Sequence, residues 1–186
     1  MPNTLNIFLL PTLCPPQGAL INSIQYGSIT IEDTDLSDTA TINSVDTSKA
    51  AVFFLGSHGS EDPIHNNLAR LVLTNATTVT AFRDHGVNGQ SMTLNFCHIE
   101  FSTGINSVQQ NTVTIPGLQT QADQTITEVD PSKAILFFCG VTTVSAEFEW
   151  YPTHPRIVLL NSTTVRAGAN QYPYDITVGF SVLEFT

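Results

Sequence analysis

Positive charge is scarce in this chain. Its 186 residues include six Lys and Arg against sixteen Asp and Glu, which gives a formal net charge of −10. Nucleic acids and anionic lipid surfaces bind proteins through clustered cations. Long apolar runs are also lacking, because no segment approaches the roughly 20 apolar residues that cross a bilayer. We therefore expect neither nucleic acid nor a membrane among the partners.

Cysteine is almost as scarce. Cys14, Cys97 and Cys139 leave at least one thiol without a partner inside the chain. The simplest interpretation is that all three are free thiols that pack as small apolar side chains. An intermolecular bridge through Cys14 or Cys97 is the alternative.

The longest early apolar run is short and ends in prolines. It consists of Ile7, Phe8, Leu9 and Leu10, with prolines at positions 11, 15 and 16. No Lys or Arg precedes it, so the pattern does not match a secretory signal. We interpret residues 1–20 as a retained, extended arm. Its apolar residues are candidates for contact with a neighbouring subunit.

What the chain does contain is an internal repeat. Residues 21–56 and 105–140 align without a gap and are identical at 16 of 36 positions. The similarity resumes after a divergent loop, where Asn75 aligns with Asn161, and continues to the pair Phe96 and Phe180. Such self-similarity indicates a duplicated structural unit. It predicts two modules, residues 21–101 and 105–185, that pack together in a fixed orientation.

Each module has the pattern of short strands separated by polar turns. The strand-like runs are rich in Val, Ile, Thr and Phe, and no window of 11 or more residues sustains a helical apolar period. The predicted class is all-β, with two tandem homologous antiparallel modules that are sandwich-like or barrel-like. In the first module the runs cover residues 27–31, 39–42, 50–55, 70–74, 77–82 and 91–101.

The repeat also predicts local details. Asp46 and Asp130 precede matching Phe-Phe strands, and each is expected to accept backbone hydrogen bonds in a turn. Asn75 is expected to begin a tight hairpin in a left-handed conformation. Apolar residues at alternate positions predict the core, in which Phe53 would occupy the same place as Phe137. The last strand is expected to face the core with Met92, Leu94, Phe96 and His98.

Few residues suggest catalysis or metal binding. His58, Glu61, Asp62 and His65 are the one dense cluster of ligand-type side chains, but their spacing matches no metal motif, and a solvated turn is the preferred interpretation. His98 is expected to be a half-buried histidine with its hydrogen bonds satisfied. No Gly-x-Ser-x-Gly elbow or phosphate loop is present. The sequence therefore favours a protein that is not an enzyme and has no cofactor.

Two other features bear on function. Glu100 and Glu184 repeat one module apart and are interpreted as solvent-facing acids at strand ends. The loop of the second module carries Phe148, Trp150 and Tyr151, which are candidate interface or sugar-stacking residues. In the alternative, Trp150 folds back over its own core.

Several repeated phrases together resemble a known group of proteins. They are Thr-Ala-Thr-Ile, Val-Asp-Thr-Ser-Lys-Ala, Phe-Phe-Leu-Gly, Leu-Thr-Asn-Ala-Thr-Thr-Val-Thr and a final Phe-x-x-x-Glu-Phe. The chain is similar in these phrases to small β-rich virion proteins of tailed bacteriophages. The resemblance covers residues 21–101 and 105–185, and the family has no active-site motif.

The resemblance implies a virion structural protein that decorates the capsid or tail and is assembled in the host cytoplasm. Its partners would be other virion subunits and further copies of itself, with a trimer as the first expectation. The alternative is a receptor- or glycan-binding module at a fibre or tail tip.

Overall fold

The computed structural model describes residues 20–59, 68–84, 91–143 and 155–186, and every element in these ranges is a β-strand. The predicted all-β class is therefore confirmed. In the first half of the chain, the strands are β1 (Ile21–Ile31), β2 (Ser37–Thr41), β3 (Ala50–Gly59), β4 (Arg70–Asn75), β5 (Thr78–Phe82) and β6 (Met92–Phe101). In the second half they are β7 (Ile105–Ile115), β8 (Gln121–Thr125), β9 (Ala134–Thr143), β10 (Arg156–Asn161), β11 (Thr164–Gly168) and β12 (Ile176–Phe185).

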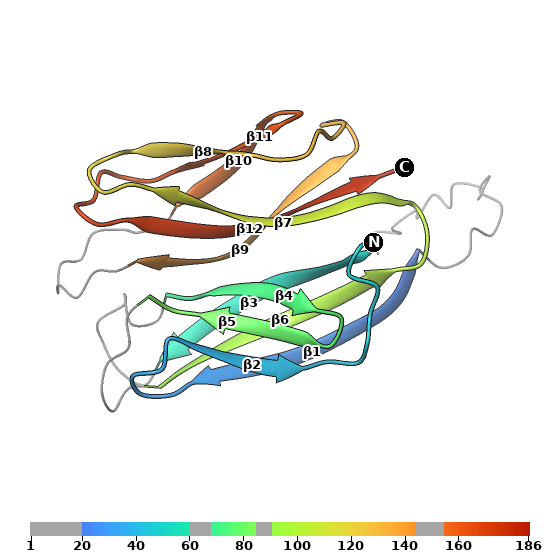
Figure 1. The fold of residues 1–186 in the computed structure, drawn as a ribbon, viewed down its shortest axis with the longest axis horizontal. Helices are drawn as coiled ribbons and strands as arrows, with labels where there is room; N and C mark the ends of the chain where they lie inside the picture. The colour runs from blue at the N-terminus through green and yellow to red at the C-terminus, as the bar shows by residue number, and fades with distance from the viewer. Residues whose placement is uncertain (1–19, 60–67, 85–90, 144–154) are drawn as a thin grey trace, which may run out of the picture.

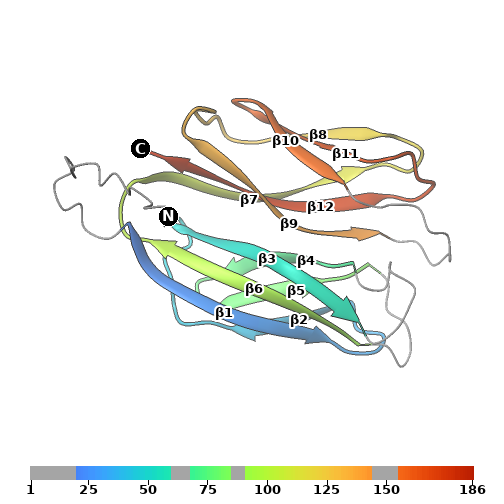
Figure 2. The ribbon, with the colours of Figure 1, turned by 180° about the vertical axis from the view of Figure 1, so that it is seen from behind.

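Each half is a sandwich-like pair of antiparallel three-stranded layers (Figure 1). The first half places β1-β6-β3 against β2-β5-β4, and the second places β7-β12-β9 against β8-β11-β10. The layers do not close into a barrel. A single bridge between Arg70 on β4 and Gly140 on β9 joins one layer of each half into a six-stranded sheet, β2-β5-β4-β9-β12-β7. Figures 1 and 2 show β9 and β12 lying over the side of the first half where β3 and β4 run.

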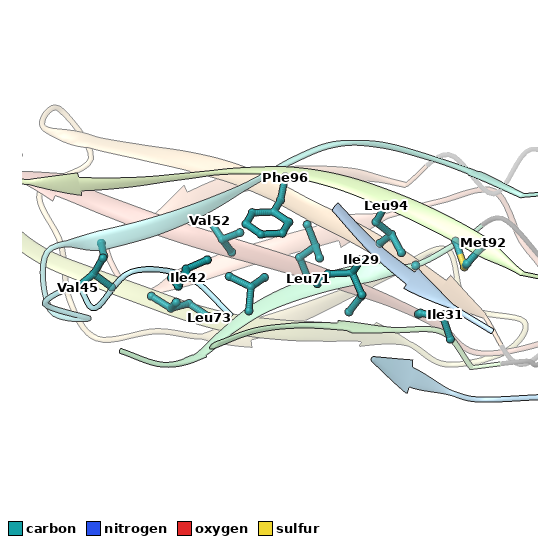
Figure 3. Close-up of a cluster of buried hydrophobic side chains, with 14 residues drawn as sticks. Ile29, Ile31, Ile42, Val45, Val52, Leu71, Leu73, Met92, Leu94 and Phe96 are labelled. Carbon is teal, nitrogen blue, oxygen red and sulfur yellow. The ribbon is translucent and has the colours of Figure 1, made fainter. Parts of the chain in front are cut away.

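Each half has its own hydrophobic core, and Figure 3 shows the first. The alternation on β6 is confirmed for Met92, Leu94 and Phe96, which are almost fully buried in it. Phe180 occupies the matching position in the second core. Antiparallel pairing sets the parity, because Phe54 lies opposite Phe96 and therefore faces the same side of the sheet.

That parity contradicts the core assignment of Phe53 and Phe137. Phe53 lies opposite Cys97, on the outward face of its sheet. Phe137 lies opposite Ser181 in the second half, also facing outward. The residues that pack against the two cores are Phe54 and Phe138.

The predicted aspartate turns are present in both halves. Asp46 Oδ1 accepts hydrogen bonds from the backbone N of Ser48 at 3.0 Å and from its Oγ at 2.6 Å. Asp130 Oδ1 accepts the same pair from Ser132 at 2.9 and 2.7 Å. The Lys49 ammonium adds an exposed ion pair to Asp46 at 3.5 Å. These local bonds fix the entry to β3 and β9.

The predicted hairpin after β4 is present, although Asn75 is not left-handed. Its Oδ1 accepts hydrogen bonds from Thr77 N at 2.9 Å and Thr77 Oγ1 at 3.1 Å. Asn161 makes the equivalent pair with Thr163. Among the non-glycine residues in the described ranges, only Asp33 and Leu118 have positive φ. A side-chain-capped turn takes the place of the expected left-handed one.

Candidate functional site: surfaces within and between the two halves

The sequence-based site candidates fall outside the described residues. This applies to Ile7, Phe8, Leu9, Leu10, Phe148, Trp150 and Tyr151, and also to Glu61, Asp62 and His65. His58 lies at the exposed end of β3. Among the residues that the structure describes, no group of three or more His, Cys, Asp or Glu side chains could hold a metal ion.

Glu100 and Glu184 are buried, so their interpretation as solvent-facing acids was wrong. Glu100 Oε1 accepts a hydrogen bond from Asp46 N at 2.7 Å, and Oε2 accepts one from Asn22 Nδ2 at 2.5 Å. Asp130 N and Asn106 Nδ2 surround Glu184 at the same distances. Backbone and side-chain donors thus lower the pKa of both carboxyl groups. With every oxygen engaged inside its own half, each glutamate ties β1 or β7 to a turn and is not placed for catalysis.

His98 faces the core as predicted, because it lies opposite the core residue Val52. The expectation of half-burial with satisfied hydrogen bonds was wrong: His98 is fully buried, and neither ring nitrogen has a hydrogen-bond partner in the described structure. Burial lowers its pKa, and the nearby Glu100 carboxylate opposes that shift. A neutral imidazole in this position behaves as a space-filling core group. The corresponding position in the second half is Val182, which is likewise fully buried.

The outward-facing phenylalanines form the centre of the contact between the halves. The rings of Phe53 and Phe137 meet edge to face, with centroids 4.5 Å apart. Phe54 and Phe138 make a similar contact at 6.2 Å. Beside them, Cys139 Sγ lies 3.6 Å from the carbonyl oxygen of Val52. Burial raises the pKa of the Cys139 thiol to about 11, so this cysteine is an inert packing group, as the free-thiol interpretation expected.

Backbone groups complete the contact along β4. Ala69 O accepts a hydrogen bond from Val141 N at 3.0 Å, and Leu73 N donates to Gln110 Oε1 at 3.0 Å. The chains approach so closely at Gly140 that an added Cβ would lie 2.1 Å from Ala69 O. The outward face of β7-β12-β9 therefore covers the side of the first half that β3 and β4 form. We call this contact the internal interface.

The contact is not two-fold symmetric. Gly56 corresponds to Gly140 in the repeat, and a Cβ added there would meet nothing within 4 Å. Tyr26 corresponds to Gln110 and is 75% exposed. A two-fold axis would give both members of each pair the same surroundings. The halves therefore contribute equivalent residues at the centre, where Phe53 meets Phe137, and different residues along β4, so the internal interface is only partly symmetric.

Two apolar surfaces remain exposed. The first, which we call the sheet face, is the outward side of β1-β6-β3 and carries Ile24, Tyr26 and Leu55. The second, which we call the outer face, is the outward side of β8-β11-β10 and carries Val158 and Leu160. Ile135 is exposed elsewhere, on the outward side of β7-β12-β9. Neither surface was predicted, because residues 50–55 are apolar on both faces and no alternation marks the exposed one. The mismatch between repeated positions, such as Tyr26 against Gln110, was the available signal.

A depression of about 360 Å³ lies on this outer face, between β8, β10 and β11. Its lining includes the apolar Val158 and Leu160 and the polar Gln121, Arg156 and Arg166. Arg166 Nε and Nη2 donate to the two carboxylate oxygens of Asp123 at 2.6 and 2.7 Å. This bidentate pair holds Arg166 in place against β8 and raises its pKa.

Comparisons with known proteins provide no family for this chain. No protein-family model matches it, and neither a curated protein nor a solved structure is significantly similar to it. Within the described ranges, no helix is long and apolar enough to cross a membrane.

Proposed function

We propose that this protein is a non-enzymatic structural component of a bacteriophage particle, a decoration or accessory protein on the capsid or tail. It binds neighbouring virion subunits through the surfaces of its β-sheets, and the arm of residues 1–20 adds a further attachment. The observation that carries the proposal is the pair of apolar surfaces that a single chain leaves in contact with water. The phage assignment itself is supported by the sequence resemblance.

The sheet face has the composition of a protein-binding surface. Leu55 on β3 is 55% exposed, and the exposed Ile24 and Tyr26 lie on β1, at the other edge of the same sheet beyond β6. Large aliphatic and aromatic residues grouped on one surface mark a contact site when the rest of the surface is polar. The acidic charge of the chain keeps it soluble until these residues meet a partner.

The first test is an inventory of purified particles by quantitative mass spectrometry. A decoration protein is expected in hundreds of copies per particle. Binding is then measured with particles that lack the protein, to which purified full-length chain is added back. Tyr26→Asp should reduce the bound amount, whereas Leu36→Asp, which changes an exposed leucine in the turn after β1, should not. Equal binding of both variants would contradict the use of the sheet face.

Deletion of residues 1–18 tests the arm separately. The shortened chain should remain folded and soluble but attach poorly to the particles. Normal attachment would place the whole binding energy in the β-sheet surfaces.

A second function, binding of a receptor or glycan at a fibre or tail tip, is favoured by the depression on the outer face of β8-β11-β10. Gln121 and Arg156 offer hydrogen-bond donors there beside the apolar Val158. This role predicts a few copies per particle and loss of host adsorption for Arg156→Ala. Hundreds of copies with unchanged adsorption would exclude it.

A further inference from the structure

β10 is an edge strand that consists almost entirely of aliphatic residues. After Arg156 it continues with Ile157, Val158, Leu159 and Leu160, and within the described residues it pairs only with β11. Edge strands usually carry charges, prolines or other features that prevent them from pairing with further strands. Of the other edge strands in the described sheets, β1, β2, β7 and β8 are rich in polar residues, and β3 lies in the internal interface. In this part of the chain, β10 is therefore the edge without such protection.

The repeat shows which backbone groups of β10 point away from β11. Leu73 corresponds to Leu159, and a bulge follows both residues at the same place. The N–H of Leu73 points away from β5, because it donates to Gln110 Oε1 at 3.0 Å. The direction of these groups alternates along a strand. Ile157 and Leu159 therefore both present their N–H and C=O groups at the free edge, and the groups of Val158 point toward β11.

The apolar side chains of β10 also lack cover. Leu71 and Leu73 on β4, whose edge lies in the internal interface, are at most 7% exposed. The corresponding Ile157 and Leu159 remain partly exposed, and Val158 on the other face of β10 is 47% exposed. Figures 1 and 2 show the layer β8-β11-β10 on the side of the second half that lies away from the first half. The first half therefore does not supply the cover that β10 lacks.

We propose that β10 pairs antiparallel with β10 of a second copy of this chain, about a two-fold axis beside Val158. Ile157 of each copy then lies opposite Leu159 of the other. In this register, unlike a shift by two residues in either direction, the N–H and C=O groups of both residues all find partners in the other copy. The outer layers of the two copies become one continuous sheet. The inference rests on the proposed function only in naming one of the neighbouring subunits that the protein binds.

The partner is a second copy because β10 is complementary to itself. Residues that lie directly opposite each other in antiparallel strands share a face of the sheet and contact each other. Val158 meets Val158 of the other copy, and Ile157 meets Leu159, so apolar residues bury one another. Arg156, the one charged residue of the strand, lies opposite Leu160 and faces no like charge. A two-fold contact uses the same edge of both copies, so assembly ends at a dimer.

The test changes the residue beside the axis in the full-length chain. Wild-type protein should reach twice the mass of the 20.2 kDa chain in analytical ultracentrifugation as its concentration rises. Val158→Lys and Val158→Glu each place like charges opposite each other, so each variant alone should stay monomeric. An equimolar mixture should restore a dimer with one copy of each. Leu36→Lys and Leu36→Glu, which make the same charge changes in the turn after β1, should dimerise like the wild type.

Thermal denaturation verifies that the variants are folded, and the masses then decide the proposal. A wild-type chain that stays monomeric at every concentration overturns it, as does a Val158→Lys chain that still dimerises. Monomers in the mixture overturn the two-fold register, and wild-type species that grow beyond the dimer overturn the closed contact.

Hydrogen exchange followed by NMR locates the contact on the strand edge. In the wild type, the N–H groups of Ile157 and Leu159 should exchange more slowly as the protein dimerises, and in Val158→Glu they should exchange rapidly at every concentration. Dimers in which these two groups stay unprotected would overturn the pairing of the edges. Particle binding separates this inference from the proposed function: a monomer that binds particles overturns only the dimer, whereas a dimer that binds none contradicts only the proposed function.

Discussion

Gly140 and Gly56 provide a matched pair of substitutions that isolates the internal interface. Both have positive φ, +98° and +123°, so Ala is strained at either position by about 1–2 kcal/mol. Gly56→Ala should cost this amount and no more, because its Cβ enters open space. Gly140→Ala also places a methyl group 2.1 Å from Ala69 O, which forces β4 away. Overpacking adds about 1–3 kcal/mol, and loss of the hydrogen bond from Val141 N adds about 1 kcal/mol.

The free energies of unfolding of the two variants should therefore differ by about 2–4 kcal/mol, the sum of those two contributions. Urea denaturation measures this difference, at a concentration where light scattering reports monomers so that self-association does not contribute. The strain common to both glycines cancels in the comparison. Equal destabilisation by Gly56→Ala and Gly140→Ala would refute the packing of the halves described here, because it would mean that β4 and β9 do not approach each other in solution.

Three further predictions concern single polar side chains, two of them buried and one in an exposed turn. Burial lowers the pKa of His98 in the folded protein. The free energy of unfolding therefore falls as the pH drops below about 6.5, because the unfolded chain then takes up a proton that the folded chain does not. His98→Leu should gain about 1–2 kcal/mol at neutral pH by removing unpaired polar atoms and should flatten the dependence between about pH 7 and 5, as denaturation at each pH would show. The pKa of Glu100 and Glu184 is lowered, so their contribution is present above about pH 4.5 and lost as the pH falls through the folded values. Glu100→Gln should lower the melting temperature at pH 7 and reduce the further loss on acidification; an unchanged acid profile would contradict the bonding described for this carboxylate. Asp46→Ala should lower the melting temperature without weakening attachment to particles. If the variant instead keeps its melting temperature and no longer attaches, the turn is part of a binding interface.

Local features of the fold were predictable, and contacts between distant segments were not. The Asp46 turn depends on neighbours two and three residues away, so its pattern is complete within a short segment. The assignment of Phe53 to the core failed because residues 50–55 are apolar at every position. When both faces of a strand are buried, alternation disappears and parity must come from the pairing partner.

The buried glutamates carried a signal that was not used. Asn22 and Glu100 are 78 residues apart, as are Asn106 and Glu184. A polar pair kept at the same separation in both repeats indicates that the two side chains contact each other. A single carboxylate at a strand end, in contrast, indicates a side chain that is exposed to solvent. For His98 the repeat was informative, since its alignment with the apolar Val182 correctly predicted that it faces the core. The residues that the two repeats share do not specify the asymmetry of the internal interface; only positions that differ, such as Tyr26 and Gln110, carry information about it.

That asymmetry has a consequence for biosynthesis. The first half leaves the ribosome before the strands that cover it exist, because β9 and β12 begin at residues 134 and 176. Until then, Leu71 and Leu73 lie beside the uncovered edge of β4 in the nascent chain, and such an edge pairs readily with other exposed strands. The newly made first half is therefore the stage at which this protein most needs chaperone protection. Completion of the chain removes the hazard from β4 by pairing it with β9, whereas the matching strand β10 remains at the edge of its sheet.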